Sequence, residues 1–271
     1  MSAFRPRPLK VRAGLLILLL SAVAPPFHAQ QPFLSDDAEV TPKKEWHFEY
    51  FNQYATLSKN VAPDIRQNWS NFVIQYGLLE RLEVNVDFPI LYIQRGPEST
   101  LGSAFGLGDT DFAAKYKLVE DDPTSLRPAL ALTAAVEFPT GNKSNQLGSG
   151  FTDVDFNSIV QKTFAETTIV HLNFGYQVSG NTLTGAIGIR TPGHIYTTGI
   201  SVVQILSSTL SLGIDVNGAQ THTSSTFNRQ LQLTIGGNYQ VAKTATFDFA
   251  LLVGWYSAPR IGILIGTSIS P

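Results

Sequence analysis

The sequence predicts an all-β protein, an antiparallel transmembrane up-and-down β-barrel of about twelve strands. Three features indicate this fold. Short segments such as 129–138 and 245–256 alternate apolar residues with polar or small ones. The connectors between these segments alternate in length along the chain. Charged residues make up 15% of the chain, whereas a soluble protein carries about a quarter.

Each alternating segment has one apolar face, because successive side chains of a strand point to opposite sides. In an outer-membrane barrel the apolar face contacts lipid and the other face lines the lumen. In the first strand, Trp46 and Phe48 are expected outward and His47 inward. The facing of the second strand stays open, since a lipid face formed by Phe72, Ile74 and Tyr76 would turn Trp69 inward. The expected strands cover about 45–57, 65–76, 82–93, 109–118, 129–138, 153–164, 168–178, 194–205, 209–216, 228–241, 245–256 and 260–269.

The connectors sort by parity. Those after even-numbered strands are mostly short, whereas those after odd-numbered strands are mostly long, as at 94–107, 139–152, 179–193 and 217–227, with 257–259 as an exception. In a meander this parity places the short turns at one end and the long loops at the other. Outer-membrane barrels show this asymmetry, with short periplasmic turns and longer outer loops.

Residues 1–29 are expected to be a signal peptide. A basic start precedes an apolar run from Ala13 to Ala24, which is shorter than the roughly twenty residues of a spanning helix. Cleavage after Ala29 is favoured over cleavage after Ala24, because Pro25 follows directly. The mature chain is therefore expected in the outer membrane of a diderm bacterium, and it has no cysteine for a disulfide.

The mature chain divides into two parts. Residues 30–44 predict an irregular periplasmic extension, since Pro32 and Pro42 disfavour strand pairing. Residues 45–271 predict the barrel. The net charge of -2 and the lack of a basic cluster beyond the signal peptide argue against a nucleic-acid partner. Membrane lipid and a small-molecule solute are the expected partners.

No arrangement of residues predicts catalysis. The chain has no cysteine, and its five histidines are scattered without metal-ligand spacing. An enzymatic barrel such as a phospholipase needs a serine and a histidine together at the lipid boundary, and no convincing pair is present. Gly106 and Gly148 do not lie between a strand and a helix, so a phosphate-binding loop is disfavoured. We therefore expect no enzyme activity, cofactor or metal.

Several short motifs are similar to those of the barrels named for a MetA pathway of phenol degradation. The similar segments are Pro32-Phe33-Leu34-Ser35-Asp36-Asp37-Ala38-Glu39, Trp46-His47-Phe48-Glu49, Tyr76-Gly77 through Leu82-Glu83, Gly106-Leu107-Gly108-Asp109-Thr110 and Glu137-Phe138-Pro139-Thr140-Gly141. The resemblance implies an outer-membrane barrel and suggests aromatic or hydrophobic solutes. It implies no catalytic residues. The chain departs from the common pattern of such barrels by ending in Pro271 instead of an aromatic residue.

Charged residues of the lumen are the main candidates for function. Seven carboxylates are expected to point inward near the long-loop end and to form an acidic mouth: Asp87, Asp109, Asp111, Glu137, Asp153, Asp155 and Asp215. Lys115 and Lys117 are expected to point inward nearer the short-turn end. Excess charge of one sign at a pore mouth concentrates counterions, which predicts a preference for cations.

Other interpretations of these carboxylates remain open. They could pair with arginines such as Arg95, Arg127 or Arg260, or only hydrate the rim. A third option is calcium capture by Asp109, Asp111, Asp153 and Asp155, since hard cations favour carboxylate clusters.

The expected function is passive passage of small molecules. An eight-stranded barrel is filled by side chains and a sixteen-stranded one holds a channel, so in a barrel of about twelve the lumen side chains or the N-terminal extension decide. Small inward residues favour a path: Ala129, Ala131, Ala135, Gly213, Gly236, Gly254, Gly262 and Gly266. The alternative is a non-conducting structural or adhesive barrel that acts through its outer loops.

Overall fold

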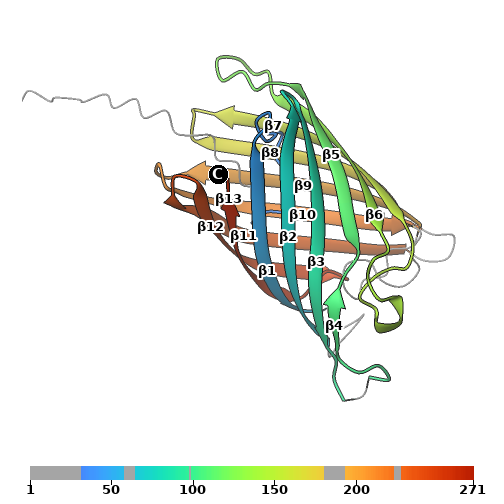
Figure 1. Cartoon of the computed structure of the whole chain (residues 1–271). Helices are drawn as coiled ribbons and strands as arrows, with labels where there is room; N and C mark the ends of the chain where they lie inside the picture. The colour runs from blue at the N-terminus through green and yellow to red at the C-terminus, as the bar shows by residue number, and fades with distance from the viewer. Residues whose placement is uncertain (1–31, 58–64, 98, 180–192, 223–226) are drawn as a thin grey trace, which may run out of the picture.

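The computed structural model describes residues 32–57, 65–97, 99–179, 193–222 and 227–271. The predicted signal peptide, residues 1–29, lies outside this part of the chain. The described residues form a closed antiparallel barrel of twelve strands plus one extra strand (Figure 1). The barrel strands are β1 (Trp46–Thr56), β2 (Arg66–Leu79), β3 (Leu82–Gln94), β5 (Thr110–Val119), β6 (Ala129–Phe138), β7 (Asp153–Phe164), β8 (Thr168–Ser179), β9 (Gly193–Ile205), β10 (Leu210–His222), β11 (Phe227–Ala242), β12 (Ala245–Tyr256) and β13 (Ile261–Ile269).

The barrel closes by pairing its first and last strands. β1 pairs antiparallel with β13, with Phe48 opposite Ile269 and Thr56 opposite Ile261. Every other barrel strand pairs with its neighbour along the chain. Closure leaves no free sheet edge among the barrel strands, which removes the need to protect one with charge or proline. The predicted meander is thus confirmed.

The extra strand, β4 (Ala104–Leu107), differs from expectation, because 94–107 was predicted to be a loop. It pairs with the far end of β3, with Ile93 opposite Ala104. Ala104 is buried in an apolar cluster with Leu91 and Ile93, while Phe105 is exposed. The alternation of inward and outward side chains therefore continues into this segment, and its short length concealed the pattern.

A second difference concerns the expected loop 217–227. β10 continues to His222 and β11 begins at Phe227, with Asn217 opposite Gln232. The polar residues that suggested a loop belong to the β10–β11 ladder. Polar side chains on the lumen face are compatible with a strand, so they do not mark its end. The connector between β10 and β11 is therefore shorter than expected for the long-loop end. The connector 257–260 between β12 and β13 is short as well.

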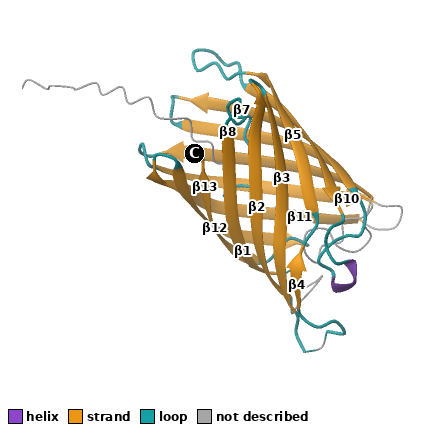
Figure 2. Cartoon of the chain, viewed as in Figure 1, coloured by secondary structure: helices purple, strands orange, loops and turns teal. Residues whose placement is uncertain are grey.

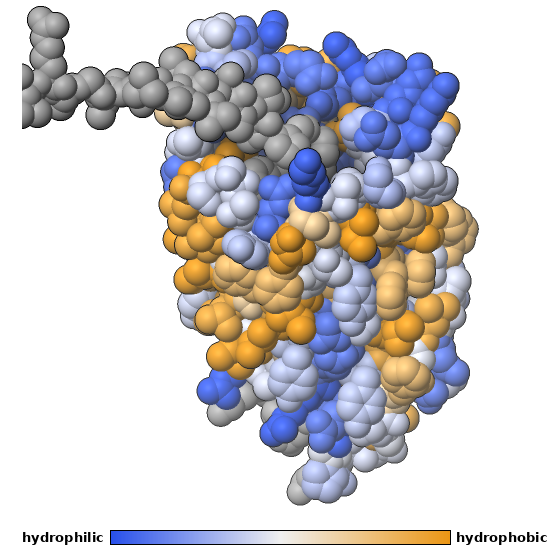
Figure 3. Space-filling view, turned by 60° about the vertical axis from the view of Figure 1, so that its left-hand side comes forward, coloured by the Kyte–Doolittle hydropathy of each residue, from blue (hydrophilic) through white to orange (hydrophobic). Residues whose placement is uncertain are grey.

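The two faces of the barrel wall have opposite character. Leu132, Phe174, Ile214 and Leu251 are among many apolar side chains exposed on the outside, and Figure 3 shows apolar residues gathered across the middle of one face. Exposed aromatic side chains lie near both ends of the strands, as outer-membrane barrels require at the two interfaces: Trp46, Phe164, Tyr239 and Phe247 at one end, and Tyr92, Phe138, Tyr196 and Trp255 at the other.

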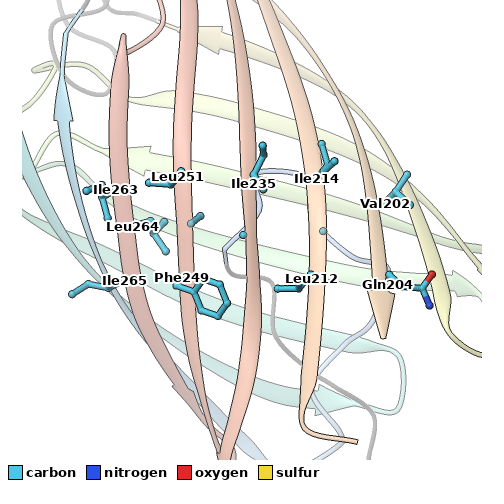
Figure 4. Close-up of a pocket in the computed structure, with 13 residues that line it drawn as sticks. Val202, Gln204, Leu212, Ile214, Ile235, Phe249, Leu251, Ile263, Leu264 and Ile265 are labelled. Atoms are coloured by element: carbon cyan, nitrogen blue, oxygen red, sulfur yellow. The ribbon is translucent and has the colours of Figure 1, made fainter. Parts of the chain in front are cut away.

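An apolar groove of about 660 Å³ lies on the outside of β9–β13 (Figure 4). Val202, Ile214, Ile235, Leu251 and Ile263 line it, and all five are exposed. Such a surface is suited to contact with acyl chains. Among the described residues, no helix is long and apolar enough to cross a membrane.

The connectors define two ends of the barrel. The short-turn end holds the connectors 80–81, 165–167, 206–209 and 243–244 and the end of β13. The long-loop end holds β4 and the connector 139–152, which contains a single 3₁₀ turn, Lys143–Asn145 (Figure 2). Loops and turns lie at the two ends and strands fill the wall between them.

One longer connector, 120–128, joins β5 and β6 at the short-turn end. Nζ of Lys162 lies 2.6 Å from Oδ1 of Asp121, and the backbone N–H of Thr163 donates to the same carboxylate at 3.0 Å. Burial would raise the pKa of Asp121, but these hydrogen bonds outweigh burial and hold that pKa below its ordinary value. The connector is thereby fixed against the end of β7.

Candidate functional site

The lumen is the candidate functional site, and the N-terminal segment lies inside it. Residues Pro32–Thr41, here called the lumen segment, contact inward-facing side chains of β3, β5, β7, β8 and β10. Those contacts lie toward the short-turn end of the strands. The lumen segment has no helix or strand of its own.

Lumen side chains accept the backbone N–H groups of the lumen segment. Leu34 donates to Asp215 at 2.9 Å, Asp36 to Asn173 at 3.0 Å, Ala38 to Gln161 at 2.9 Å and Thr41 to Glu83 at 2.6 Å. An irregular segment inside a barrel has no ladder to satisfy its backbone. Four wall side chains therefore accept the backbone hydrogen bonds that a neighbouring strand accepts in a sheet. They are Asp215, Asn173, Gln161 and Glu83.

Ion pairs add to this attachment. Nζ of Lys115 lies 3.1 Å from Asp36 and 3.5 Å from Asp37, and Nζ of Lys117 lies 2.6 Å from Glu39. Lys115 is only 1% exposed, and a charge so deeply buried needs a partner. The two lysines predicted to point inward are therefore on the lumen face, and both hold the lumen segment.

Small wall residues make room for the lumen segment. A Cβ atom at Gly213 would lie 2.7 Å from the ring of Phe33, and one at Gly236 would lie 2.9 Å from Pro32. Ala38 packs with Ala129, Ala131 and Ile159. The sequence was interpreted as leaving an open path at these positions. That interpretation is corrected at Gly213, Gly236, Ala129 and Ala131, because the N-terminal segment occupies the space.

Five of the predicted mouth carboxylates form a row on the inner wall. Asp87 lies opposite Asp111, Asp111 opposite Glu137, and Glu137 opposite Asp153, across the consecutive pairs β3–β5, β5–β6 and β6–β7. Asp155 follows Asp153 two residues along the same face of β7. This acidic row (Asp87, Asp111, Glu137, Asp153 and Asp155) lies closer to the long-loop end than the lysines do. Like charges placed directly opposite in a sheet destabilise it unless water, protons or counterions offset them.

The other predicted mouth residues have structural partners. Asp109 accepts the backbone N–H groups of Gly141 and Ser149 at 2.9 and 2.5 Å, which anchors the connector 139–152. Asp215 lies apart from the row and is fully buried, and it binds Leu34 and Ser35 of the lumen segment. Within the row, Asp153 accepts Ser179 at 2.7 Å and Asp87 accepts Asn71 at 2.8 Å.

Two of the three arginines proposed as partners, Arg95 and Arg127, are engaged elsewhere. Arg95 donates to the carbonyls of Gly102 and Asn145 and to Gln146, and Arg127 lies 3.8 Å from Asp122. Within the described part of the chain, the ion pairs closer than 4.0 Å include none of Asp111, Glu137 or Asp155. No group of three or more histidine, aspartate or glutamate residues in that part is arranged to hold a metal ion.

The remaining lumen wall has two sectors. An apolar cluster from β1, β2, β12 and β13 includes Phe51, Val73, Leu252 and Leu264, and Trp69 packs on it with its ring 5.3 Å from that of Phe51. A cavity of about 270 Å³ lies against Leu34 on the other side, and amide, hydroxyl and apolar side chains all line it. Its wall comes from β7–β11. Trp69 therefore lies on the lumen face, which settles the facing of the second strand.

Sequence reasoning missed the wall residues that hold the lumen segment, above all Glu83, Gln161 and Asn173. Each looks like an ordinary inward polar residue of a barrel strand. Charge complementarity signals only where the segment lies, because the segment carries Asp36, Asp37 and Glu39 while the inward face of β5 carries two lysines. It does not single out Glu83, Gln161 or Asn173, which accept backbone N–H groups.

Comparisons with known proteins agree with this geometry. The family model described as "Putative MetA-pathway of phenol degradation" matches residues 66–262. A search of curated proteins finds no match. Among solved structures, the COG4313 outer membrane channel from Pseudomonas putida F1 has a TM-score of 0.67 and 19% identity, over 87% of this chain and 98% of that one.

Two further structures are similar in fold. The NanC porin has a TM-score of 0.55 and 8% identity, over 82% of this chain and 98% of its own. The β domain of the Bordetella autotransporter BrkA has a TM-score of 0.52 and 11% identity, over 84% of this chain and 100% of its own. At these identities the likeness shows the fold, which channels, porins and an autotransporter share.

Proposed function

The chain belongs to the family described as "Putative MetA-pathway of phenol degradation", and we propose that it is a passive outer-membrane channel or facilitator for small molecules. One observation carries the proposal: a closed barrel exposes apolar side chains outside and polar side chains inside. A wall of this kind is stable in lipid only as a closed barrel with a lumen. The short-turn end then faces the periplasm.

The location can be tested by fractionation. The mature chain is expected in the outer-membrane fraction and in solution only with detergent. Recovery as a soluble periplasmic protein without detergent would contradict the proposal.

The acidic row gives the channel a preference for cations. Where they are ionised, Asp111, Glu137 and Asp155 supply negative charge to the lumen without a neighbouring lysine or arginine among the described residues. In a narrow lumen of low dielectric, such charge attracts cations and repels anions.

The proposed solute is a small molecule, and the side chains of the lumen wall indicate its chemical class. The family description points to aromatic or hydrophobic compounds, and the apolar cluster around Phe51 and Trp69 supports that class. A flux assay in liposomes tests passage directly. Phenol, glucose and arabinose should enter liposomes that contain the protein faster than protein-free liposomes. For each solute, an entry rate that is the same with and without the protein would contradict passive transport.

A non-conducting barrel is the second candidate, and the lumen segment favours it. The segment fills part of the lumen and is held by four backbone hydrogen bonds to wall side chains. If it closes the lumen permanently, the long-loop end would carry the function. Passage through the intact protein decides between the two candidates.

A further inference from the structure

The cavity beside Leu34 has a wall chemistry that selects one kind of solute. It measures about 270 Å³ and lies between the lumen segment and the long-loop end. Asn157, Asn217, Gln230 and Gln232 line it with side-chain amides, and Thr197 adds a hydroxyl. The sequence pattern did not single out these residues.

Internal hydrogen bonds orient several of the amides. Nδ2 of Asn157 donates to Oδ1 of Asn173 at 2.8 Å, Nδ2 of Asn217 donates to Asp215, and Nε2 of Gln232 donates to Thr234 at 3.4 Å. Each bond uses one N–H of its amide, and Oδ1 of Asn217 also accepts the hydroxyl of Ser35 at 3.5 Å. An amide held in this way offers an acceptor to a third group. The cavity wall therefore offers the amide oxygens of Asn157 and Gln232 as acceptors, beside the remaining N–H groups of the amides.

Asp155 adds a negative charge to the same wall. It lines the cavity and also belongs to the acidic row, so it connects the two. No lysine or arginine of the described chain lies within 4.0 Å of its carboxylate. The side chains of Leu34, Ala219 and Ala258 add apolar surface to the wall.

We propose that this cavity is a binding subsite for a small hydroxylated amine, a solute with several hydrogen-bond donors and one positive charge. The ammonium group binds Asp155, and hydroxyl groups donate to the amide oxygens of Asn157 and Gln232. An apolar solute would strip water from the amides without replacing its hydrogen bonds. An anion would meet the acidic row. The inference rests on the proposed function and adds to it a second solute class, with a site separate from the apolar cluster around Phe51 and Trp69.

Three sugars of one ring size test the site, because they differ mainly in charge. Calorimetric titration of the purified full-length protein in detergent, at low salt, compares glucosamine, glucose and glucuronate. Glucosamine should bind at least about tenfold more tightly than glucose, glucuronate should bind most weakly, and the contrast should shrink as salt is added. Equal affinity for the three sugars would overturn the proposal.

Matched variants locate the binding. D155N should bring glucosamine down to the affinity of glucose and leave glucose binding within about twofold. T197V removes one hydroxyl at constant shape and should weaken glucose and glucosamine binding about fivefold. T133V, on the lumen face of β6 outside the cavity, should bind like the parent. If glucosamine preference survives D155N in a correctly folded barrel, the proposed site is wrong.

Conductance measurements separate this inference from the proposed function. A protein that binds glucosamine with the expected variant pattern but never passes ions would contradict the channel and leave the site standing. A conducting, cation-selective protein without any contrast between the sugars would contradict the site and leave the channel standing.

Discussion

Individual side chains are assigned to lipid or lumen by their exposure. Leu251 is 57% exposed on the outside of β12, in the apolar groove of Figure 4. Its neighbour Leu252 is 1% exposed on the inside. The alternation of exposed and buried residues along one strand therefore makes a charge costly at one position and less costly at a position on the lumen face.

L251R should destabilise the folded barrel by about 2–4 kcal/mol, because it places a charge in the middle of the lipid-facing wall. T133R, on the lumen face of β6, should cost much less. Urea unfolding in lipid vesicles measures both free energies, and L251A serves as the control for the lost apolar contact. Equal stability of L251R and T133R would show that the facing is assigned wrongly.

Lys115 is the single charge on which the lumen segment most depends. It pairs with Asp36 and Asp37 and lies 4.0 Å from Glu83. Removing one member of a buried ion pair costs about 3–5 kcal/mol, because the remaining charge is left without a partner. Release of the segment into water, with the barrel still closed, is the change that costs the least free energy.

K115M should therefore expose the lumen segment. Ala38 is fully buried and the chain contains no cysteine, so A38C reports exposure through its rate of reaction with a thiol reagent. The rate should rise at least about tenfold in K115M, and neutralising the partners as well, with D36N and D37N, should restore slow labelling. An unchanged rate in K115M would argue against the ion pairs as the attachment.

At the scale of elements, the lumen segment decides how much of the lumen is open. Its Phe33 and Pro32 fill the space above Gly213 and Gly236, and its backbone is bonded to the walls on both sides. Replacing residues 32–41 by glycine and serine of equal length should increase single-channel conductance several-fold, because the new segment lacks the carboxylates and the ring that hold it in place. Circular dichroism should show the same strand content. Unchanged conductance would mean that the passage lies elsewhere.

The connectors provide a second prediction at this scale. Asn145 lies at the long-loop end, and Thr244 and Thr124 lie at the short-turn end. With the short-turn end in the periplasm, N145C should react with a membrane-impermeant thiol reagent on whole cells, and T244C and T124C should react only after the outer membrane is broken. The loop positions Ser99 and Ser224 are expected to behave like Asn145, although Ser224 lies outside the described residues. Labelling of T244C but not of N145C on whole cells would invert the topology.

Sequence alternation predicted the elements well because a barrel wall is a repeating local pattern. Strand number, facing and the closed meander follow from period-two alternation. β4 and the full lengths of β10 and β11 did not, since polar residues on a lumen face resemble those of a loop. The position of the lumen segment could not be read from local pattern either, because its bonds join residues far apart in the chain, such as Ser35 and Asp215.

The candidate site was predictable in part for the same reason. Inward placement of Lys115, Lys117 and the acidic row follows from strand parity. The division of the seven carboxylates into a row, a loop anchor at Asp109 and a segment anchor at Asp215 depends on three-dimensional contacts. The amide-lined cavity likewise combines five strands, and no single strand reveals it.

Across the whole molecule, the acidic row should give the lumen a field that favours cations. Under a salt gradient, the reversal potential of the parent should show cation preference, which should shrink as salt rises, since the Debye length falls to about 3 Å at 1 M. D111N, E137Q and D155N together should remove most of this preference without unfolding the barrel. K43M, which removes a partly exposed charge outside the lumen, is the control. Anion preference in the parent would contradict the acidic row as the selectivity element.

Passage through the barrel is measured most directly as single-channel current in planar bilayers, with the full mature chain and with the variant whose residues 32–41 are replaced. We expect discrete cation-selective openings from the mature chain and larger ones from the variant, since a closed wall with a polar lumen encloses the path. The absence of current from both proteins, when both are folded and inserted, would contradict the channel and favour a structural barrel.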